Sequence, residues 1–351
     1  NYNFGESPTA ASGGLLEGKA AQIVSWERST KFNIGMDTRW FEGKLTLNAE
    51  YFRENRTNIL KTPSRTNIIS GVTSFSPQNL MEVKKQGEEV EAGWDHKIKD
   101  FGYRIKANIA YNHNEIIEQN EQIRKYPYMN RTGGSIGQQF SLIADGFYNT
   151  YAEIAAGPTQ YGTLQPGDVR FRDINGDGVI NDRDKAPIGY SSLLPRINYG
   201  FSLSANWKGF DVSIMLQGVG QYSKTYSGAG IYESSGNFYK MHMERWSEER
   251  YNNHEKITYP RLSSSGGPSL QPNDFFIMDA SYIRLKNAEV GYTLPENISK
   301  KIGASNVRFY LSGNNLYTWT HLKTDSFDPE QNSPAAYPTM RTYNVGLNIT
   351  F

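Results

Sequence analysis

The chain has 351 residues with 37 basic and 36 acidic side chains and no long basic run, which excludes nucleic acid as an expected partner. It contains no cysteine, which excludes disulfides, thiolate metal sites and cysteine nucleophiles. No stretch of about 18 apolar residues occurs, so the sequence predicts no transmembrane helix, although membrane-spanning strands need only about 9–11 residues, half of which face a polar lumen.

The chain begins at Asn1 rather than at a methionine, without a signal-peptide pattern, so we expect a piece of a longer protein. Residues Asn1–Thr30 are rich in Gly, Ser, Ala and Pro and predict a loop. Segments that alternate apolar and polar residues then follow and predict strands. In chain order they are Lys31–Trp40, Lys44–Arg53, Gly87–Lys97, Tyr103–His113, Gly137–Tyr148, Gly167–Asp173, Pro195–Trp207, Phe210–Gly218, Phe276–Thr293, Asn306–Tyr317 and Tyr343–Phe351.

Short and long connections alternate between these segments. Short turns occur at Glu42-Gly43, Lys99–Gly102 and Lys208-Gly209, whereas Glu54–Gln86 and Val219–Asn273 are long and polar. Membrane barrels segregate connections in this way, with tight turns at the periplasm and long loops outside. All short turns fall on one side only if Gly167–Asp173 is counted as a strand, which gives about eleven antiparallel strands. Because an open array of strands would leave unpaired edges in lipid, the predicted fold is all-β, residues 1–351 forming about half of a roughly 22-stranded, plugged transmembrane barrel.

The final segment, TYNVGLNITF, alternates cleanly and ends on an aromatic residue. Val345, Leu347 and Ile349 share one face with Tyr343 and Phe351, and the other face is polar. Taken alone, this pattern fits the last strand of a membrane barrel or of a soluble β-sandwich. The rival interpretation of the chain is a secreted, calcium-stabilised β-sandwich that acts as a lectin or glycan hydrolase.

Residues 173–184 read DINGDGVINDRD, the spacing of the twelve-residue calcium loop. Alternate side chains would converge on a hard cation, and the glycine after the third ligand position, Gly178, permits the sharp turn. Because aspartate stands where glutamate is usual, we expect weak affinity for a structural divalent cation, calcium by preference. A turn without an ion is the alternative. The predicted ligands are Asp173, Asn175, Asp177, the carbonyl of Val179, and Asp184.

No other motif predicts a catalytic or metal site, so we expect no enzyme activity. The five histidines are scattered and no HExxH, GxSxG or Walker motif occurs. Asp325 and Asp328 imitate a glycosidase pair, but a solvated loop turn is the preferred interpretation. Tyrosines in the longest loop could stack on sugar rings or form an interfacial girdle; they are Tyr222, Tyr226, Tyr232 and Tyr239.

Several motifs, in order along nearly the whole chain, resemble SusC/RagA-type TonB-dependent transporters of Bacteroidetes. They are WERSTKFNIGMD, the stretch GDVRFRDINGDGVINDRDKAPIGYSSLLPRINYGFSLSANWKGFDVSIMLQGVG, SYIRLKNAEVGYTLP, VRFYLSGNNLYTWT, DSFDPE and YNVGLNITF. The calcium-type loop matches a motif common in that family.

The resemblance implies that residues 1–351 are the C-terminal half of an outer-membrane barrel. Such barrels import large nutrients, usually glycans and sometimes peptides, driven by TonB. It implies a SusD-like surface lipoprotein that lids the barrel, and an N-terminal plug and TonB-contacting segment that this chain does not include. Polar residues such as Asn198, Asn206 and Asn348 would line the lumen rather than catalyse. No substrate-binding residue can be named from the resemblance.

Overall fold

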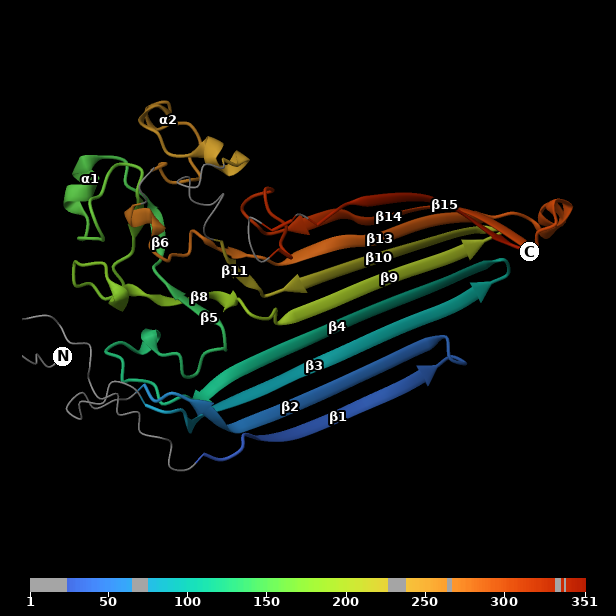
Figure 1. The fold of residues 1–351 in the computed structure, drawn as a ribbon, viewed down its shortest axis with the longest axis horizontal. Helices are drawn as coiled ribbons and strands as arrows, with labels where there is room; N and C mark the ends of the chain where they lie inside the picture. Colours follow the sequence, from blue (N-terminus) through green and yellow to red (C-terminus); the bar gives the residue numbers. More distant parts are fainter. Residues whose placement is uncertain (1–23, 65–74, 227–237, 264–266, 332–335, 338) are drawn as a thin grey trace, which may run out of the picture.

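The computed structural model describes residues 24–64, 75–226, 238–263, 267–331, 336–337 and 339–351. Its main feature is a nine-stranded antiparallel sheet in the order β1-β2-β3-β4-β9-β10-β13-β14-β15 (Figure 1). No helix among the described residues is long and apolar enough to span a membrane. The strands of this sheet are β1 (Arg28–Trp40), β2 (Leu45–Lys61), β3 (Gln78–Ile98), β4 (Phe101–Glu118), β9 (Ile197–Trp207), β10 (Phe210–Gly220), β13 (Tyr282–Thr293), β14 (Asn306–Thr320) and β15 (Thr342–Thr350).

The short connections gather at one end of the sheet and the long loops at the other (Figure 1). Lys208 and Gly209, which join β9 to β10, both have positive φ, of 45° and 89°. Two left-handed residues in a two-residue loop match the right-handed twist of the flanking strands, so this turn keeps the strands in register. The predicted segregation of turns and loops is therefore confirmed.

Two predicted barrel strands are not part of the main sheet, and this prediction was wrong. The segments 137–148 and 167–173 contain only short strands, which pair in small sheets within the loop between β4 and β9. Strands of three to six residues cannot cross a bilayer, which needs about 9–11. β4 instead pairs directly with β9, with Ile105 opposite Leu203. The small strands are β5 (Gln138–Ser141), β6 (Ala144–Phe147), β7 (Val169–Phe171) and β8 (Ala186–Ser191).

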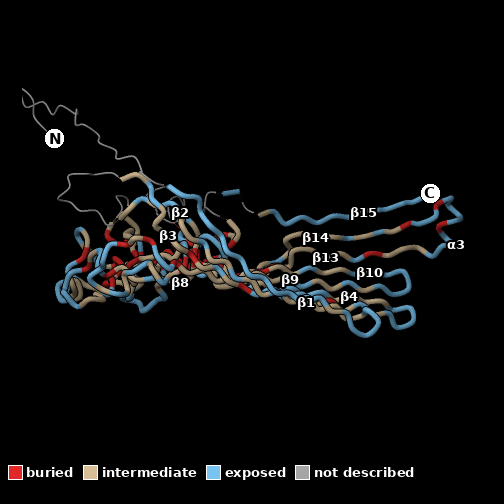
Figure 2. The backbone as a smooth tube through the Cα atoms, turned by 90° about the horizontal axis from the view of Figure 1, so that it is seen from below, coloured by how far each residue is buried: buried red, intermediate tan, exposed pale blue. Residues whose placement is uncertain are grey.

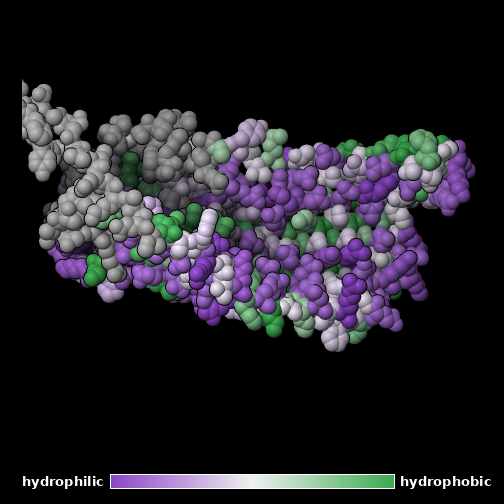
Figure 3. All heavy atoms as spheres, turned by 60° about the horizontal axis from the view of Figure 1, so that its bottom comes forward, coloured by the Kyte–Doolittle hydropathy of each residue, from purple (hydrophilic) through white to green (hydrophobic). Residues whose placement is uncertain are grey.

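One face of the main sheet is apolar and exposed. The side chains of Val345, Leu347 and Ile349 on β15 are 86%, 50% and 44% exposed, and Phe201 on β9 is 37% exposed. A β-sandwich would bury such a row against a second sheet. Among the described residues no sheet covers it, so the sandwich interpretation fails and the apolar face is the lipid-facing side of a barrel wall. In the view of Figure 3, hydrophilic residues dominate much of the surface, with hydrophobic residues in separate patches.

Aromatic rings mark the turn end of the apolar face. The indole N–H of Trp94 donates to the hydroxyl of Tyr103 at 3.0 Å, and the rings of Phe210 and Tyr292 lie 4.5 Å apart. On β4, Tyr103 and Tyr111 enclose an apolar stretch that extends about 26 Å along the strand. Because tilt shortens its projection, this stretch approaches the apolar height of about 25 Å of outer-membrane barrels.

The hydrophobic core lies not under the sheet but among the long loops, where the buried residues of Figure 2 concentrate. One cluster contains Tyr226, Tyr259, Phe276 and Phe327, and a second contains Leu142, Val169, Phe171 and Ile180. We call this packed region, formed by residues 119–196, 221–226, 238–263, 267–281 and 321–331, the loop body. Its remaining strands and helices are β11 (Ser223–Thr225), β12 (Ile277–Asp279), α1 (Tyr151–Ala156), α2 (Glu248–Asn252), η2 (Pro127–Met129), η3 (Asp182–Asp184), η5 (Lys240–Glu244) and η6 (Pro268–Leu270); α3 (Glu296–Ser299) and η7 (Lys300–Ile302) lie in the β13–β14 connection.

The tyrosines of the longest loop serve this core. Tyr226 is buried in it, and the partly buried Tyr222 and Tyr239 pack against it, so these rings belong to the loop core rather than to an interfacial girdle. Tyr232 lies outside the described residues. Burial raises the pKa of the Tyr226 hydroxyl, which therefore stays neutral at physiological pH.

Candidate functional site

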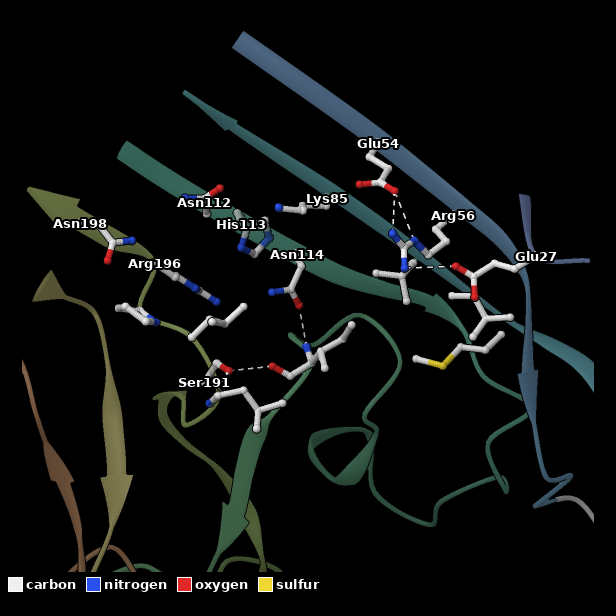
Figure 4. Close-up of a pocket in the computed structure, with 17 residues that line it drawn as sticks. Glu27, Glu54, Arg56, Lys85, Asn112, His113, Asn114, Ser191, Arg196 and Asn198 are labelled. Carbon is white, nitrogen blue, oxygen red and sulfur yellow. Dashed lines mark hydrogen bonds and ion pairs between the residues drawn. The ribbon is translucent and has the colours of Figure 1, made fainter. Parts of the chain in front are cut away.

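A cavity of about 640 Å³ lies where the polar face of the sheet meets the loop body (Figure 4). β2, β3, β4 and β9 supply one wall, and residues 191–196 with Ile136 supply the other. The strands are long enough to reach it: β3 has 21 residues, about twice what crosses a bilayer. Lys85 and Asn114, which are register partners, lie three residues beyond the pair Glu88 and Tyr111, towards the loop body.

A compact ion-paired group forms one side of the cavity. Arg56 on β2 contacts Glu27 at 3.1 Å and Glu54 at 3.0 Å. The hydroxyl of Ser29 also donates to Glu54, at 2.7 Å. The carboxylates of Glu27 and Glu54 are therefore both paired with Arg56 (Figure 4).

The other side of the cavity carries cations without a carboxylate. Arg196 donates from Nη2 to the hydroxyl of Ser135 at 2.8 Å, and its guanidinium lies 5.4 Å from the ring of Tyr190. Lys85 lies 5.3 Å from the ring of Phe52. Within the described residues, neither cation forms an ion pair. The ring nitrogen Nδ1 of His113 and Nε of Arg196 are buried there without a hydrogen-bond partner in the described chain.

Hydrogen bonds hold the loop wall against the strands. The side-chain oxygen of Asn114 accepts from the backbone N–H of Ile136 at 2.7 Å, and the hydroxyl of Ser191 donates to the carbonyl of Ile136 at 2.8 Å. The apolar part of the lining comprises Ile59, Met81, Val83, Ile136, Leu193, Leu194 and Pro195. The cavity thus combines charge of both signs with an aliphatic wall.

A buried cation fastens a third loop to the sheet. Arg284 on β13 is 1% exposed and donates from Nη2 to both oxygens of Asp328, at 2.6 and 2.7 Å. Its Nη1 donates to Glu330 at 2.8 Å. Asp328 is therefore not a solvated turn residue, and its partner in the predicted pair, Asp325, instead contacts Lys240 on the surface. The DSFDPE segment anchors its loop rather than presenting paired catalytic carboxylates.

The calcium-type loop folds as a tight series of side-chain-capped turns. Asp173 accepts from the backbone N–H of Gly176 and of Gly178, each at 2.7 Å, and Asp177 accepts from that of Val179 at 3.0 Å. Asn175 accepts from the N–H of Asp177 at 2.8 Å. The hydrogen bond from Gly178, ahead of other causes, holds the pKa of the Asp173 carboxyl below its usual range.

Asp184 closes this loop from inside. It is fully buried and accepts from the N–H of Ile174 at 3.0 Å and of Asn181 at 2.9 Å. Its carboxyl also approaches that of Asp173. The amide nitrogen of Asn175 is buried without a hydrogen-bond partner in the described chain. In the described residues, no group of three or more His, Cys, Asp or Glu side chains has a metal-binding arrangement, so a site here would need the oxygens of Asn175 and Val179 as well.

Comparison with known proteins identifies the fold. The family described as "TonB dependent receptor-like, beta-barrel" matches residues 2–316. The chain belongs to this family. Barrels of TonB-dependent receptors lie in the outer membrane, which agrees with the exposed apolar face of the sheet. The resemblance to SusC/RagA-type receptors is confirmed by the relatives and structures below.

The receptor chain is 27% identical over 369 residues to TonB-dependent receptor P3 of Formosa agariphila, covering 97% of this chain and 36% of the relative. It is 26% identical to the TonB-dependent receptor SusC of Bacteroides thetaiotaomicron, covering 93% and 32%. The chain therefore spans about a third of these curated relatives. In fold it is similar to the RagAB peptide importer in its open-open state, with a TM-score of 0.69, 24% identity, and coverage of 93% of this chain and 35% of the other.

Sequence reasoning missed the cavity. Its charged residues come from the segment before β1, from β2 and β3, and from the start of β9. No local motif joins Arg56, Lys85 and Arg196, which only the strand order brings to one place. The one available signal was Asn198, predicted to line the lumen and found in the cavity lining.

Proposed function

We propose that the receptor imports large nutrients, glycans or peptides, across the bacterial outer membrane, together with a SusD-like surface lipoprotein and with energy from the TonB complex. The cavity of about 640 Å³ supports this most directly, because it lies on the polar face of the wall beside the loop body. A nutrient arriving from the long-loop end would meet it before entering the lumen. The similarity to SusC and to the RagAB peptide importer supports the same proposal.

The test uses the full-length receptor in its own host. We expect deletion of its gene to abolish uptake of a labelled nutrient, and dissipation of the proton gradient to abolish uptake by the wild type. A surface lipoprotein should copurify with the detergent-extracted receptor. Uptake that persists in energy-depleted cells would indicate a passive pore. Purification of the receptor without any lipoprotein would contradict the proposed SusD-like partner.

We also propose that the loop of residues 173–184 holds a structural divalent cation, calcium by preference. Its donor chemistry fits a hard cation, since Asp173, Asp177 and Asp184 provide carboxylates and Asn175 an amide. The loop is tied to the loop body, because Ile180 packs in the second hydrophobic cluster and Val179 forms a bridge with Thr159. An ion would therefore stiffen the loop body without taking part in chemistry.

Calcium is expected to stabilise the full-length receptor through this loop. Calcium at a hundredfold excess over its dissociation constant would add about 2.7 kcal/mol to the free energy of unfolding of the loop body. Asp173→Ala should remove the calcium-dependent rise in melting temperature. Asp182→Ala is the matched control, because this exposed carboxylate pairs with Lys185 in the same loop. A calcium response that survives in the Asp173 variant would locate the ion elsewhere.

A further inference from the structure

We propose that the cationic side of the cavity binds the carboxylate of a peptide whose aliphatic side chain lies along the wall formed by Leu193 and Leu194. This inference rests on the proposed import function and specifies its substrate class. It assigns Arg196 and Lys85 to the carboxylate.

Arg196 is the strongest anion ligand of the cavity. One N–H of its Nη2 is engaged with Ser135 and its Nε is buried, which leaves Nη1 and the second N–H of Nη2 as donors for a ligand. A guanidinium presents its donors in a rigid fork that matches a carboxylate. The contact with Ser135 fixes the fork, so little side-chain freedom is lost when an anion binds.

Lys85 belongs to the same side, whereas His113, the register partner of Gln86, points to the opposite face of β3 and β4 from Lys85. The backbone N–H of Asn112 donates to the carbonyl of Arg196 at 2.7 Å, which makes these two residues neighbours across β4 and β9. Lys85 is paired with Asn114 on the next strand. The two cations are two strand spacings of about 4.8 Å apart and are offset by two residues along the strands, so their backbones lie about 12 Å apart, and their long side chains can reach one ligand between them.

Among the described residues, the carboxylates that line the cavity do not form ion pairs with Arg196 or Lys85. Three permanent cations and two carboxylates line the cavity, and both carboxylates contact Arg56. Figure 4 shows this ion-paired group apart from Arg196, while Lys85 lies opposite Glu54 in the register of β2 and β3 without forming an ion pair with it. An anionic ligand would therefore find two free cations, whereas a cationic ligand would find carboxylates already occupied.

The apolar lining favours a peptide over a sugar. Leu193 and Leu194 are 62% and 69% exposed, and the remaining apolar lining residues are aliphatic, Met81 or Pro195. No Phe, Tyr or Trp occurs among the described residues that line the cavity, so the large ring faces on which sugars stack are missing. The volume of about 640 Å³ falls within the range of pockets for small ligands and fits a short peptide.

The experiment measures binding to the full-length receptor with its lipoprotein, purified in detergent. The probes are Ala-Leu-Leu with a free C-terminus, the same peptide with an amidated C-terminus, and a trigalacturonate. We expect the free peptide to bind at least about tenfold more tightly than the amidated one, the effect of a charge-assisted hydrogen bond. Equal affinity of the two peptides would overturn the inference, and tighter binding of trigalacturonate would overturn its peptide part.

Variants locate the effect. Arg196→Gln and Lys85→Gln should each reduce the preference for the free C-terminus about tenfold, and Arg196→Lys should retain part of it. Lys106→Gln is the matched control, because this exposed cation lies on β4 outside the cavity. An unchanged preference in both cavity variants would overturn the assignment. Import that continues without a carboxylate preference would refute this inference alone, whereas a receptor that imports nothing would refute the proposed function.

Discussion

Replacing Arg284 with alanine is expected to destabilise the loop body by about 3 kcal/mol, at the lower end of the range for breaking a buried ion pair. Arg284 is 1% exposed and donates hydrogen bonds of 2.8 Å or less to the carboxylates of Asp328 and Glu330 and to the hydroxyl of Thr318. Its removal leaves Asp328 without a cation and Glu330 with only the more distant Lys286 at 3.9 Å, next to the buried core of the loop body. The lower end applies because the side chains of Asp328 and Glu330 are 18% and 29% exposed and can recruit water.

Hydrogen exchange of the full-length receptor in detergent measures this effect by region. Exchange should accelerate in residues 321–331 and remain slow in the strands of the wall. Lys240→Ala is the control, since this lysine forms an exposed pair with Asp325 and such pairs contribute about 0–1 kcal/mol. Combining Arg284→Met with Asp328→Asn and Glu330→Gln should recover part of the loss. Equal effects of Arg284→Ala and Lys240→Ala would show that the buried cluster is not an anchor.

Placing a charge on the lipid-facing side of the wall should have a similarly large effect. Phe201 lies on β9 opposite Ala107 and Leu216, near the middle of the apolar stretch. Phe201→Arg is expected to cost about 2–4 kcal/mol, the penalty of an arginine near the bilayer midplane. Urea unfolding of the receptor folded into lipid vesicles provides the measurement.

Met215→Arg is the matched control for Phe201→Arg. Met215 is a large apolar residue at nearly the same height on β10, and its register partners Ser202 and Asn287 belong to the polar face. It is 45% exposed, so an arginine there would reach the aqueous lumen at little cost. A larger loss for Met215→Arg than for Phe201→Arg would mean that the two faces of the sheet have been assigned the wrong way round.

The wall could be predicted from the sequence because its information is local. Alternation along β9 and β15 gave the strands and their apolar face, and Lys208-Gly209 marked a hairpin. The errors lay at 137–148 and 167–173, where short alternating runs resemble transmembrane strands. Their three- and four-residue strands pair within the loop, and only the partner, which the sequence does not name, distinguishes the two cases.

The cavity and the anchor could not be predicted because both are non-local. Arg284 lies 44 residues from Asp328, and the cavity joins residues from Glu27 to Asn198. The DSFDPE segment resembles a solvated turn because its local sequence does not indicate that Asp328 pairs with a buried arginine on β13. The calcium-type loop differs from both: its ligands are contiguous, so the sequence could specify the set, and its occupancy stays a prediction.

Apolar residues face opposite directions in the two parts of this chain. Val345 on the wall faces outward to the lipid, whereas Phe276 in the loop body is buried in a core. One polypeptide is thus solvated by lipid along its wall and by water around its loop body. In a mutational scan that replaces apolar residues with polar ones, substitutions at the outward positions of the wall should not be tolerated. Substitutions at the outward positions of the loop body should be tolerated. The exterior loops can therefore change their ligand contacts over generations while the part that meets lipid stays constrained.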